Sequence, residues 1–498
     1  MDEYAIPPHE RDGGYRRGPV VHRSEDAPVN LSFGSIETAE GLTDVDAARV
    51  AELVEVFNRV AARNRRLMRY YNADVTLPEV NLGFALDERL AKSLDVRCGW
   101  PAKAVSCLVT RSVFDGYVAS DPEVRGELHA ITRDNALVQA YNRARYSEAA
   151  LGVTFATLSW SEEGRARVRF HTAQTATAVW DGTRGRLAYG LAVIDSAKYN
   201  NDSDWLPSVV NVYTDDHIIV LTRYDSTHWR ARYVEHGLGR PPMVALVNEP
   251  TDRKPFGRSR VSATVMSITD EALRTMGRMS MSSELFTYPQ KYVLGLTDDL
   301  VKDLDSFTLA MNKVIKLGVN PETGQNADVK QFAASSMEPH LATLRSLATL
   351  FAGETACPVS ELGVITDNPS SAEAILASKE ALLTLVEAFN ACNQAALYTV
   401  AELCLALNLG TSVDDLPEEY HDFEAHFKSP TLASLASQTD AVVKIASVDP
   451  SFAGTDVFYS LLGLDSATIR QIQDQKTRNA GQAMLSELLK GGGNGDAT

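Results

Sequence analysis

The sequence predicts an α+β protein that is divided into several domains or forms one elongated subunit. The chain has 498 residues, which is too long for a single hydrophobic core. Hydrophobic residues make up 44% of it and charged residues 23%, as in folded globular proteins. Residues 152–247 consist of strand-length runs, whereas helical spacing of apolar residues dominates much of the chain on either side. Separate helical and β parts are therefore expected.

Composition disfavours several classes of protein. The formal net charge is −17, from 48 Lys and Arg against 65 Asp and Glu, so the chain lacks the cations that a tight, sequence-independent grip on DNA requires. No apolar run approaches the ~18 residues of a membrane span, and the start lacks a secretory signal, so a soluble protein that is not exported is expected. The cysteines have no C-x-x-C spacing, which indicates neither a disulfide framework nor a zinc site and fits a reducing cytosol. They are Cys98, Cys107, Cys357, Cys392 and Cys404.

The N-terminal part is predicted to begin with an arm and to continue as α+β. Residues 1–41 mix Pro, Gly, Arg and acidic residues without periodicity, which is typical of an appendage. A helix is predicted from Asp44, another over Leu128–Tyr146, and a strand over Ala104–Val109. Arginines crowd the end of the first helix, and we interpret them as cations that favour a helix C-terminus rather than as a nucleic-acid patch. They are Arg59, Arg63, Arg65, Arg66 and Arg69.

The region over residues 152–247 is predicted to be mainly antiparallel β. Its β-branched and aromatic runs have the length of strands and are separated by turn residues. The predicted strands include residues 165–170, 175–180, 209–213 and 217–224.

Three long helices are predicted between Pro255 and Asn408. The first, over Val261–Phe286, carries an apolar stripe about seven turns long, and Tyr288-Pro289 ends it. The second covers Pro339–Gly353.

The third helix, Ser371–Asn408, is the longest, at about 55 Å for ~1.5 Å per residue. The loop Glu354–Ser370 precedes this helix and leads into a sequence that is typical of a helix N-cap. A helix of this length is not expected in a compact monomer, whereas a ring of subunits can pack many such helices side by side. A further helix is predicted over Leu432–Val448, before a glycine-rich tail.

The motifs that enforce a catalytic mechanism are absent, including the P-loop, the dinucleotide-binding fingerprint, H-E-x-x-H and G-x-S-x-G. Asp215, Asp216 and His217 are the best candidates for acid–base or metal chemistry, but neighbouring strand residues face opposite sides, so a plain turn is expected. His421 and His426 are spaced off a common helix face, which disfavours metal ligation. We expect no catalytic residue, no metal and no cofactor, and thus an assembly subunit rather than an enzyme.

Three groups of motifs, taken in order, strongly resemble the portal proteins of tailed bacteriophages. The first is Pro255-Phe256-Gly257-Arg258-Ser259-Arg260-Val261 with Tyr288-Pro289-Gln290-Lys291-Tyr292-Val293-Leu294-Gly295. The second is Cys357-Pro358 with Leu362-Gly363, Asn368 and Ser371-Ala372-Glu373-Ala374-Ile375. The third is Thr439-Asp440-Ala441-Val442-Val443-Lys444 with Leu462-Gly463-Leu464 and Ile469. The resemblance covers residues 30 to 480, nearly the whole chain.

The resemblance implies a ring-forming, elongated multi-domain portal fold with long channel helices. Its parts would be an N-terminal arm at 1–41, a wing at 42–254, a first stem helix at 255–286, a clip at 287–336, a second stem helix at 337–353, a tunnel loop at 354–370, the long helix and the rest of the wing at 371–430, a crown at 431–480 and a flexible tail at 481–498. The implied stem residues are Arg258, Ser259, Ile268, Ala272 and Met276. The implied clip residues, which would contact terminase and adaptor, are Tyr288, Pro289, Lys291 and Tyr292. In the implied tunnel loop, the residues that we expect to face DNA are Glu361, Asp367, Asn368, Ser370 and Ser371. For Glu361 and Asp367 the alternative is that they only keep the loop soluble.

The resemblance also implies a function and partners. Portal proteins form dodecameric homo-oligomeric rings at one capsid vertex of the virion, where double-stranded DNA passes during packaging and ejection without specific binding. Terminase, the head-to-tail adaptor, and major capsid and scaffolding proteins would be the partners, with no membrane, and assembly would occur in the host cytoplasm. An acidic chain suits a conduit through which DNA slides. The alternatives are another oligomeric phage head or connector protein, or a cytosolic hydrolase with an unrecognised site around residues 215–217.

Overall fold

The computed structural model describes residues 31–76, 96–161, 163–197, 206–225, 227–287, 291–294, 328–331, 336–363, 372–430 and 435–464, with short pieces between 468 and 482. The chain divides into two compact units, Met1–Lys428 and Ser429–Thr498. The described residues contain both helices and antiparallel strands, so the predicted α+β class is confirmed. Residues 1–30 of the predicted arm, and the predicted tail except for residue 482, lie outside the described residues.

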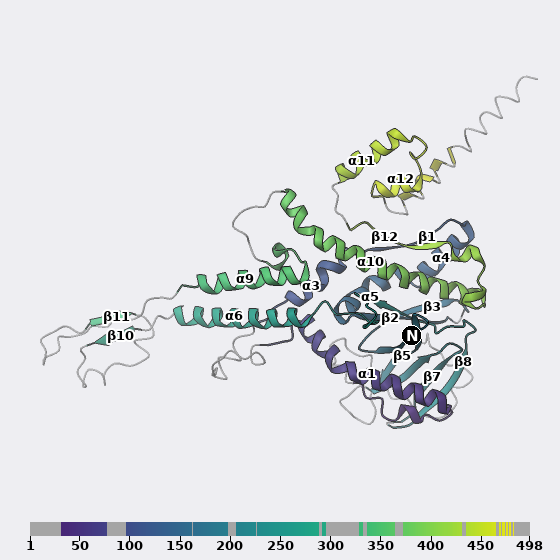
Figure 1. The fold of residues 1–498 in the computed structure, drawn as a ribbon, viewed down its shortest axis with the longest axis horizontal. Helices are drawn as coiled ribbons and strands as arrows, with labels where there is room; N and C mark the ends of the chain where they lie inside the picture. Colours follow the sequence, from purple (N-terminus) through teal and green to yellow (C-terminus); the bar gives the residue numbers. More distant parts are fainter. Residues whose placement is uncertain are drawn as a thin grey trace, which may run out of the picture. The chain divides into compact units, whose positions relative to one another are not determined.

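The first unit contains a five-stranded antiparallel sheet in which each strand pairs with the next along the chain. Helix α1 (Asp44–Tyr71) lies across one face of this sheet (Figure 1) and buries Val50, Leu53 and Phe57 against strand residues such as Leu191. The prediction of a helix from Asp44 and of an antiparallel β region is therefore confirmed. The strands are β4 (Ala176–Asp181), β5 (Arg186–Ala197), β6 (Leu206–Tyr213), β7 (His217–Arg223) and β8 (Trp229–Glu235).

Residues 31–41 belong to this core, so the predicted arm is wrong at its C-terminal end. Phe33 and Ile36 are buried, the latter in the single turn η2 (Ile36–Thr38). Glu40 pairs with the edge strand β8, because its N–H donates to the Trp229 carbonyl and its carbonyl accepts from the Ala231 N–H, both at 2.8 Å. A short irregular segment packs through single side chains, so its sequence shows no repeating apolar face.

A second sheet has the order β3-β2-β9, with antiparallel pairs, and lies next to helix α5 (Leu137–Leu151). Its strands are β2 (Val153–Trp160), β3 (Ala166–Thr172) and β9 (Met243–Val247). A separate antiparallel pair joins β1 (Phe114–Ala119) to β12 (Phe423–Phe427), strands that are far apart in the sequence.

Two predictions for the N-terminal helical part are wrong. Ala104–Val109 is not a strand but the end of helix α3 (Trp100–Val109). This run is short, apolar and mostly buried, and such a run can be either a buried strand or a buried helical segment. The helix predicted over Leu128–Tyr146 is instead two helices, α4 (Pro122–Asp134) and α5. They are separated at Asn135 and at Ala136, whose φ is +44°.

A pair of long helices leaves this body side by side (Figure 1). Helix α6 (Ala263–Thr287) leads to strand β10 (Lys291–Leu294), and strand β11 (Asp328–Gln331) returns to helix α9 (Glu338–Thr355). The two strands pair antiparallel, with Lys291 opposite Gln331. Both helices predicted here from the sequence are confirmed, within two residues at each end.

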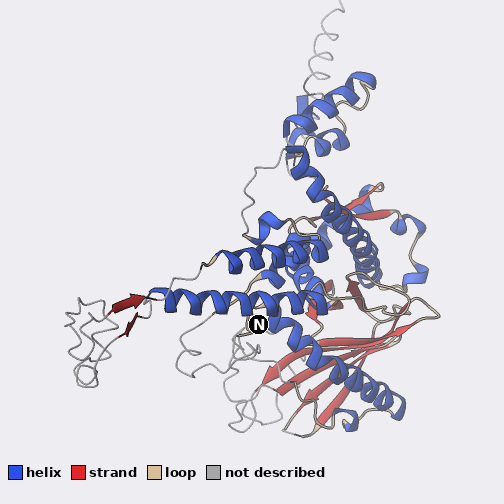
Figure 2. Cartoon of the chain, turned by 60° about the vertical axis from the view of Figure 1, so that its left-hand side comes forward, coloured by secondary structure: helices blue, strands red, loops and turns tan. Residues whose placement is uncertain are grey.

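Helix α10 (Ala372–Leu409) follows and is the longest described helix, as predicted. Its C-terminal half is buried in a core that includes Leu397, Val400 and Leu158. The 3₁₀ turns η5 (Val413–Asp415) and η6 (Glu418–His421) then lead to β12. The second unit contains α11 (Leu435–Val448), which confirms the helix predicted there, and α12 (Asp456–Leu461). Figure 2 shows the strands of the five-stranded sheet as one layer with a helix running along it.

Candidate functional site: the base of the helix pair

Helices α6 and α9 run antiparallel and are tied to each other near both ends. The Ser262 hydroxyl donates to the Glu354 carboxylate at 3.0 Å, and the Ser282 hydroxyl lies 3.5 Å from Nε2 of His340. Ser262 precedes α6 and Glu354 ends α9, whereas the other two residues lie toward the opposite ends. Between these ties lie buried apolar side chains, among them Val265, Ala272, Ala348 and Phe351.

The loop before α6 is fixed to the end of β9. Gly257 has a φ of +64°, and a Cβ there would lie 2.1 Å from the Asn248 carbonyl oxygen, so only glycine fits. The Arg258 N–H donates to that same carbonyl at 2.9 Å, and the Asn248 amide donates to the Arg258 carbonyl at 2.6 Å. Glycine is therefore required at position 257, because the backbone of Asn248 lies too close to leave room for a side chain.

Arg258 and Ser259, predicted as stem-helix residues, lie in this loop and not in the helix. Helix α6 starts later because the Ser262 hydroxyl accepts from the Val265 N–H at 3.1 Å, as an N-cap residue does. The Ser259 hydroxyl instead donates to the Ala150 carbonyl at the end of α5. The first residues of the predicted stem thus join it to the body.

Arg260 connects this loop to two helices at once. Its side chain is only 7% exposed. Nε donates to the Ala104 carbonyl of α3 at 3.4 Å, a terminal nitrogen donates to the Thr355 carbonyl of α9, and another lies 3.8 Å from the Glu249 carboxylate. Burial lowers the pKa of Arg260, and nearby Glu249 and Glu354 oppose that shift. Because a helix leaves its last carbonyls without internal partners, Arg260 acts as a cap for α9.

Glu361 connects the segment after α9 to α3. It lies in the short turn η4 (Val359–Leu362), and its carboxylate oxygens lie 3.8 Å from Lys103 and 3.8 Å from Arg111. Its side chain is 37% exposed. The sequence predicts a DNA-facing role for Glu361, and the structure places it in an ion-paired position at the start of the predicted tunnel loop.

A disulfide joins Cys107 of α3 to Cys357, just after α9, with their Cα atoms 6.0 Å apart. The expectation that no disulfide is indicated is therefore corrected at this pair. The two cysteines are 250 residues apart in the sequence, and the packing of the segment after α9 against α3 brings them together. Cys98, Cys392 and Cys404 are free.

The remaining predicted site residues are placed as follows. Ile268, Ala272 and Met276 lie on α6, where Ala272 is buried and the other two are half-buried. Lys291 and Tyr292 lie in β10. Tyr288, Pro289, Asp367, Asn368, Ser370 and Ser371 lie outside the described residues.

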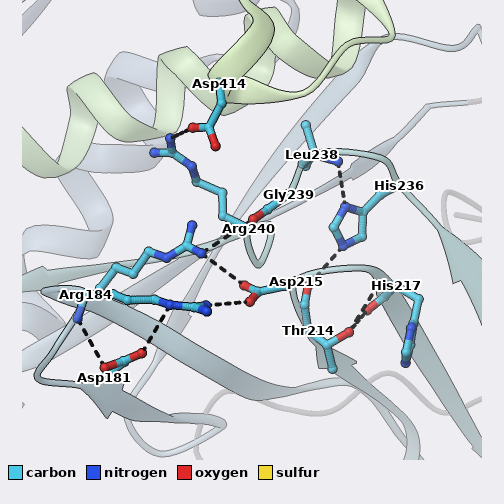
Figure 3. A network of polar contacts seen from close by, with 11 residues as sticks. Asp181, Arg184, Thr214, Asp215, His217, His236, Leu238, Gly239, Arg240 and Asp414 are labelled. Atoms are coloured by element: carbon cyan, nitrogen blue, oxygen red, sulfur yellow. Dashed lines mark hydrogen bonds and ion pairs between the residues drawn. The ribbon is translucent and has the colours of Figure 1, made fainter.

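The candidate acid–base group at residues 215–217 does not converge. Asp215 forms ion pairs with Arg184 at 3.0 Å and Arg186 at 3.6 Å, whereas Nε2 of His217 lies 3.7 Å from a carboxylate oxygen of Asp46. Figure 3 shows the Asp215 carboxylate directed toward arginine side chains and the His217 imidazole pointing away from it. The expectation of a plain turn is confirmed, and this arrangement offers no shared proton between Asp215 and His217.

His421 and His426 are likewise apart in their contacts. Nδ1 of His421 lies 3.2 Å from the Glu402 carboxylate, and Nδ1 of His426 lies 4.0 Å from Asp115. In the part of the chain that the structure describes, no group of three His, Cys, Asp or Glu residues is placed to hold a metal ion. Among these residues there is also no helix both long and apolar enough to cross a membrane.

A buried polar group links α5 to α10. Glu148 is fully buried and accepts one hydrogen bond from the Asn393 amide at 2.9 Å, while its other oxygen has no partner among the described residues. Burial raises the pKa of Glu148 to about 8, and the Asn393 bond opposes the shift. Burial and the nearby Glu148 also raise the pKa of Tyr141 and of Cys392.

Arg260 and Glu148 are not among the residues predicted from the sequence. Arg260 belongs to the quoted Pro255–Val261 motif, and a cation at the entry of an apolar helix was the available signal. Glu148 lies on a helix with ordinary composition, so only the structure shows that it is buried.

No protein-family model matches the chain. Two sequence relatives are portal proteins of mycobacterial phages. The portal protein of Mycobacterium phage D29 is 28% identical over 226 residues, which is 42% of this chain and 43% of that protein. The portal protein of Mycobacterium phage L5 is 26% identical over 228 residues, 43% of each. The matched region thus spans less than half the length of these relatives. The matches confirm the resemblance that the motifs indicate, and the chain is related to bacteriophage portal proteins.

Solved structures from gene transfer agent particles are similar to the chain at low identity. A chain from the virion of a native gene transfer agent particle is 14% identical, with a TM-score of 0.42, over 80% of this chain and 93% of that one. A chain from the neck of a native particle, computed with C12 symmetry, is 15% identical with a TM-score of 0.39, over 73% of this chain and 89% of that one.

Proposed function

We propose that the chain is a portal subunit with no catalytic activity. In this proposal it forms a homo-oligomeric, dodecameric ring at one capsid vertex of the virion, after assembly in the host cytoplasm. The ring is the channel for DNA packaging and ejection, and it docks terminase, the adaptor, and capsid and scaffolding proteins. The wing, stem, clip, tunnel loop and crown have the boundaries given above, except that residues 31–41 join the wing. The observation that carries the proposal is the antiparallel helix pair α6–α9. This pair extends from an α+β body, and the chain is related to portal proteins.

The outer face of α9 supports a ring. Between Leu341 and Gly353 the only charged residue is Arg345, which pairs with Glu338 at 3.2 Å. Leu350 on this face is 61% exposed. A helix face that meets water in a monomer ordinarily carries several charges, whereas small and apolar side chains suit close contact with another helix. We assign this face of the stem to contact with the neighbouring copy of the chain.

The contacts of Glu361 divide the proposed tunnel loop into an anchor and a DNA-facing part. Because Lys103 and Arg111 neutralise Glu361, its carboxylate adds little repulsion toward a passing phosphate. Glu361 is then an anchor of the loop. The DNA-facing role falls to Asp367, Asn368, Ser370 and Ser371.

Replacing residues 364–370 by a Gly-Ser segment of equal length tests the conduit. Ring formation should be unaffected, because the contacts of Arg260 and Glu361 remain, while packaging should fall by more than about tenfold as the channel loses its shaped loop. The measurement is nuclease-protected DNA per particle. The matched control replaces residues 198–204, between β5 and β6, in the same way and should package normally. Normal packaging by the 364–370 variant would contradict the loop assignment.

A further inference from the structure

Helix α3 holds the start of the loop after α9 through contacts of three kinds. Arg260 donates to carbonyls of both α3 and α9, and Glu361 pairs with Lys103 of α3 and with Arg111 just after α3. The third kind is covalent, between Cys107 and Cys357, whose exposed fractions are 4% and 1%. A separation of 6.0 Å between Cα atoms is within the ordinary range for disulfides, so the link closes without moving either segment.

We propose that Cys107 and Cys357 form a redox-sensitive latch that fixes the start of the loop after α9 to helix α3. The latch is open as two thiols under reducing conditions and closed as a disulfide under oxidising ones. The cytoplasm keeps thiols reduced, whereas disulfides persist outside the cell. A chain made in a cytoplasm and later released would meet both conditions. The role of the latch in the tunnel loop rests on the proposed function; its existence does not.

Closure is a thiol–disulfide exchange with a low-molecular-weight disulfide such as glutathione disulfide. The thiolate of one cysteine attacks the oxidant, forms a mixed disulfide and releases one glutathione thiolate. The second cysteine thiolate attacks the protein sulfur of that mixed disulfide and releases the second. The two cysteines lose two protons and two electrons, and the oxidant is reduced to two thiols. Because both sulfurs are buried, each exchange requires local opening of the junction.

The non-covalent contacts determine what the latch changes. Three sets of contacts remain when the sulfurs are reduced: the hydrogen bonds of Arg260, the ion pairs of Glu361, and the 2.9 Å hydrogen bond from Arg111 to the Cys107 carbonyl. These contacts hold the junction together in both states, and oxidation raises the free-energy cost of opening it. A link across 250 residues constrains the unfolded chain strongly.

The test compares the full chain after equilibration in glutathione disulfide and in dithiothreitol. Peptide mapping after alkylation in denaturant should find the peptides of Cys107 and Cys357 joined only after oxidation. The oxidised chain should melt about 5 °C or more above the reduced chain. Amide hydrogen exchange over residues 354–363 should slow by at least about tenfold on oxidation. Reversal of these differences in the reductant is also expected.

The variant Cys107→Ser/Cys357→Ser should lose all three differences, and Cys392→Ser, which removes a free thiol on α10, should keep them. Two fully alkylated cysteines after oxidation would overturn the latch, as would equal melting and exchange in the two states. These readouts do not depend on rings or packaging. A redox-dependent junction in a chain that forms no ring would support the latch and contradict the proposed function. A ring-forming chain without a redox-dependent junction would do the opposite.

Discussion

Replacing Glu148 by Gln is expected to stabilise the protein at pH 8 by about 3–5 kcal/mol and to change its stability little at pH 4. The pKa of Glu148 is raised by burial to about 8, against an ordinary value of 4.5. Between these values the carboxyl is ionised in the unfolded chain but protonated in the folded one. Unfolding therefore releases a proton, and stability falls by about 1.4 kcal/mol for each pH unit until the folded carboxyl also ionises.

The measurement is urea unfolding of wild type and Glu148→Gln from pH 4 to pH 9. The difference between the two should grow with pH, because glutamine resembles the protonated acid, keeps an acceptor for Asn393 and does not titrate. It should level off above about pH 8, where the folded carboxyl of the wild type also ionises. Glu123→Gln, on an exposed part of α4, is the control and should stay within about 0.5 kcal/mol of wild type. A constant difference across this pH range would show that Glu148 is not the group that titrates.

Replacing Arg260 by Ala should destabilise the protein by about 3 kcal/mol. The guanidinium is buried, and its removal leaves the Thr355 carbonyl at the end of α9 without its donor and Glu249 without its cation. The base of the α6–α9 pair should loosen first, because Arg260 is the residue that reaches both α3 and α9. Hydrogen exchange at the end of α9 should therefore accelerate in this variant.

Arg258→Ala is the matched control for Arg260→Ala. Arg258 lies two residues away in the same loop, but its side chain is exposed, and its backbone N–H and carbonyl form the hydrogen bonds with Asn248. Its replacement should cost less than about 0.5 kcal/mol. Equal losses in the two variants, measured by urea unfolding at pH 7, would contradict the capping role of Arg260.

Elements with a clear local pattern were predictable from the sequence, and elements without one were not. The apolar stripe of α6 and the strand-length β-branched and aromatic runs of the β region are patterns of this kind. The sequence predicts a strand over residues 104–109 because this short run is apolar and mostly buried, and it predicts an arm over residues 31–41 because they pack through isolated side chains. In both cases the partner surface, which is distant in the sequence, supplies the information that local pattern lacks.

The sequence could predict where the site lies along the chain, but not which residues contact one another there. The Pro255–Val261 motif indicated the entry of the helix pair, and Gly257 is required there by its positive φ and the nearby Asn248 carbonyl. Arg260, Glu361 and Cys357 each have a partner on α3, far away in the sequence, namely the Ala104 carbonyl, Lys103 and Cys107. No spacing rule relates such residues, so their contacts required the folded structure.

The ring is tested most directly by imaging the vertex of particles that contain the chain with electron cryo-microscopy. The account predicts a ring of copies around a central channel, with the α6–α9 pair in its wall. It predicts that Leu350→Glu is lost from the ring, whereas Leu409→Glu, a control at the exposed end of α10, is retained. Particles without a ring of this chain, together with a purified chain that remains monomeric or dimeric under all salt conditions, would contradict it.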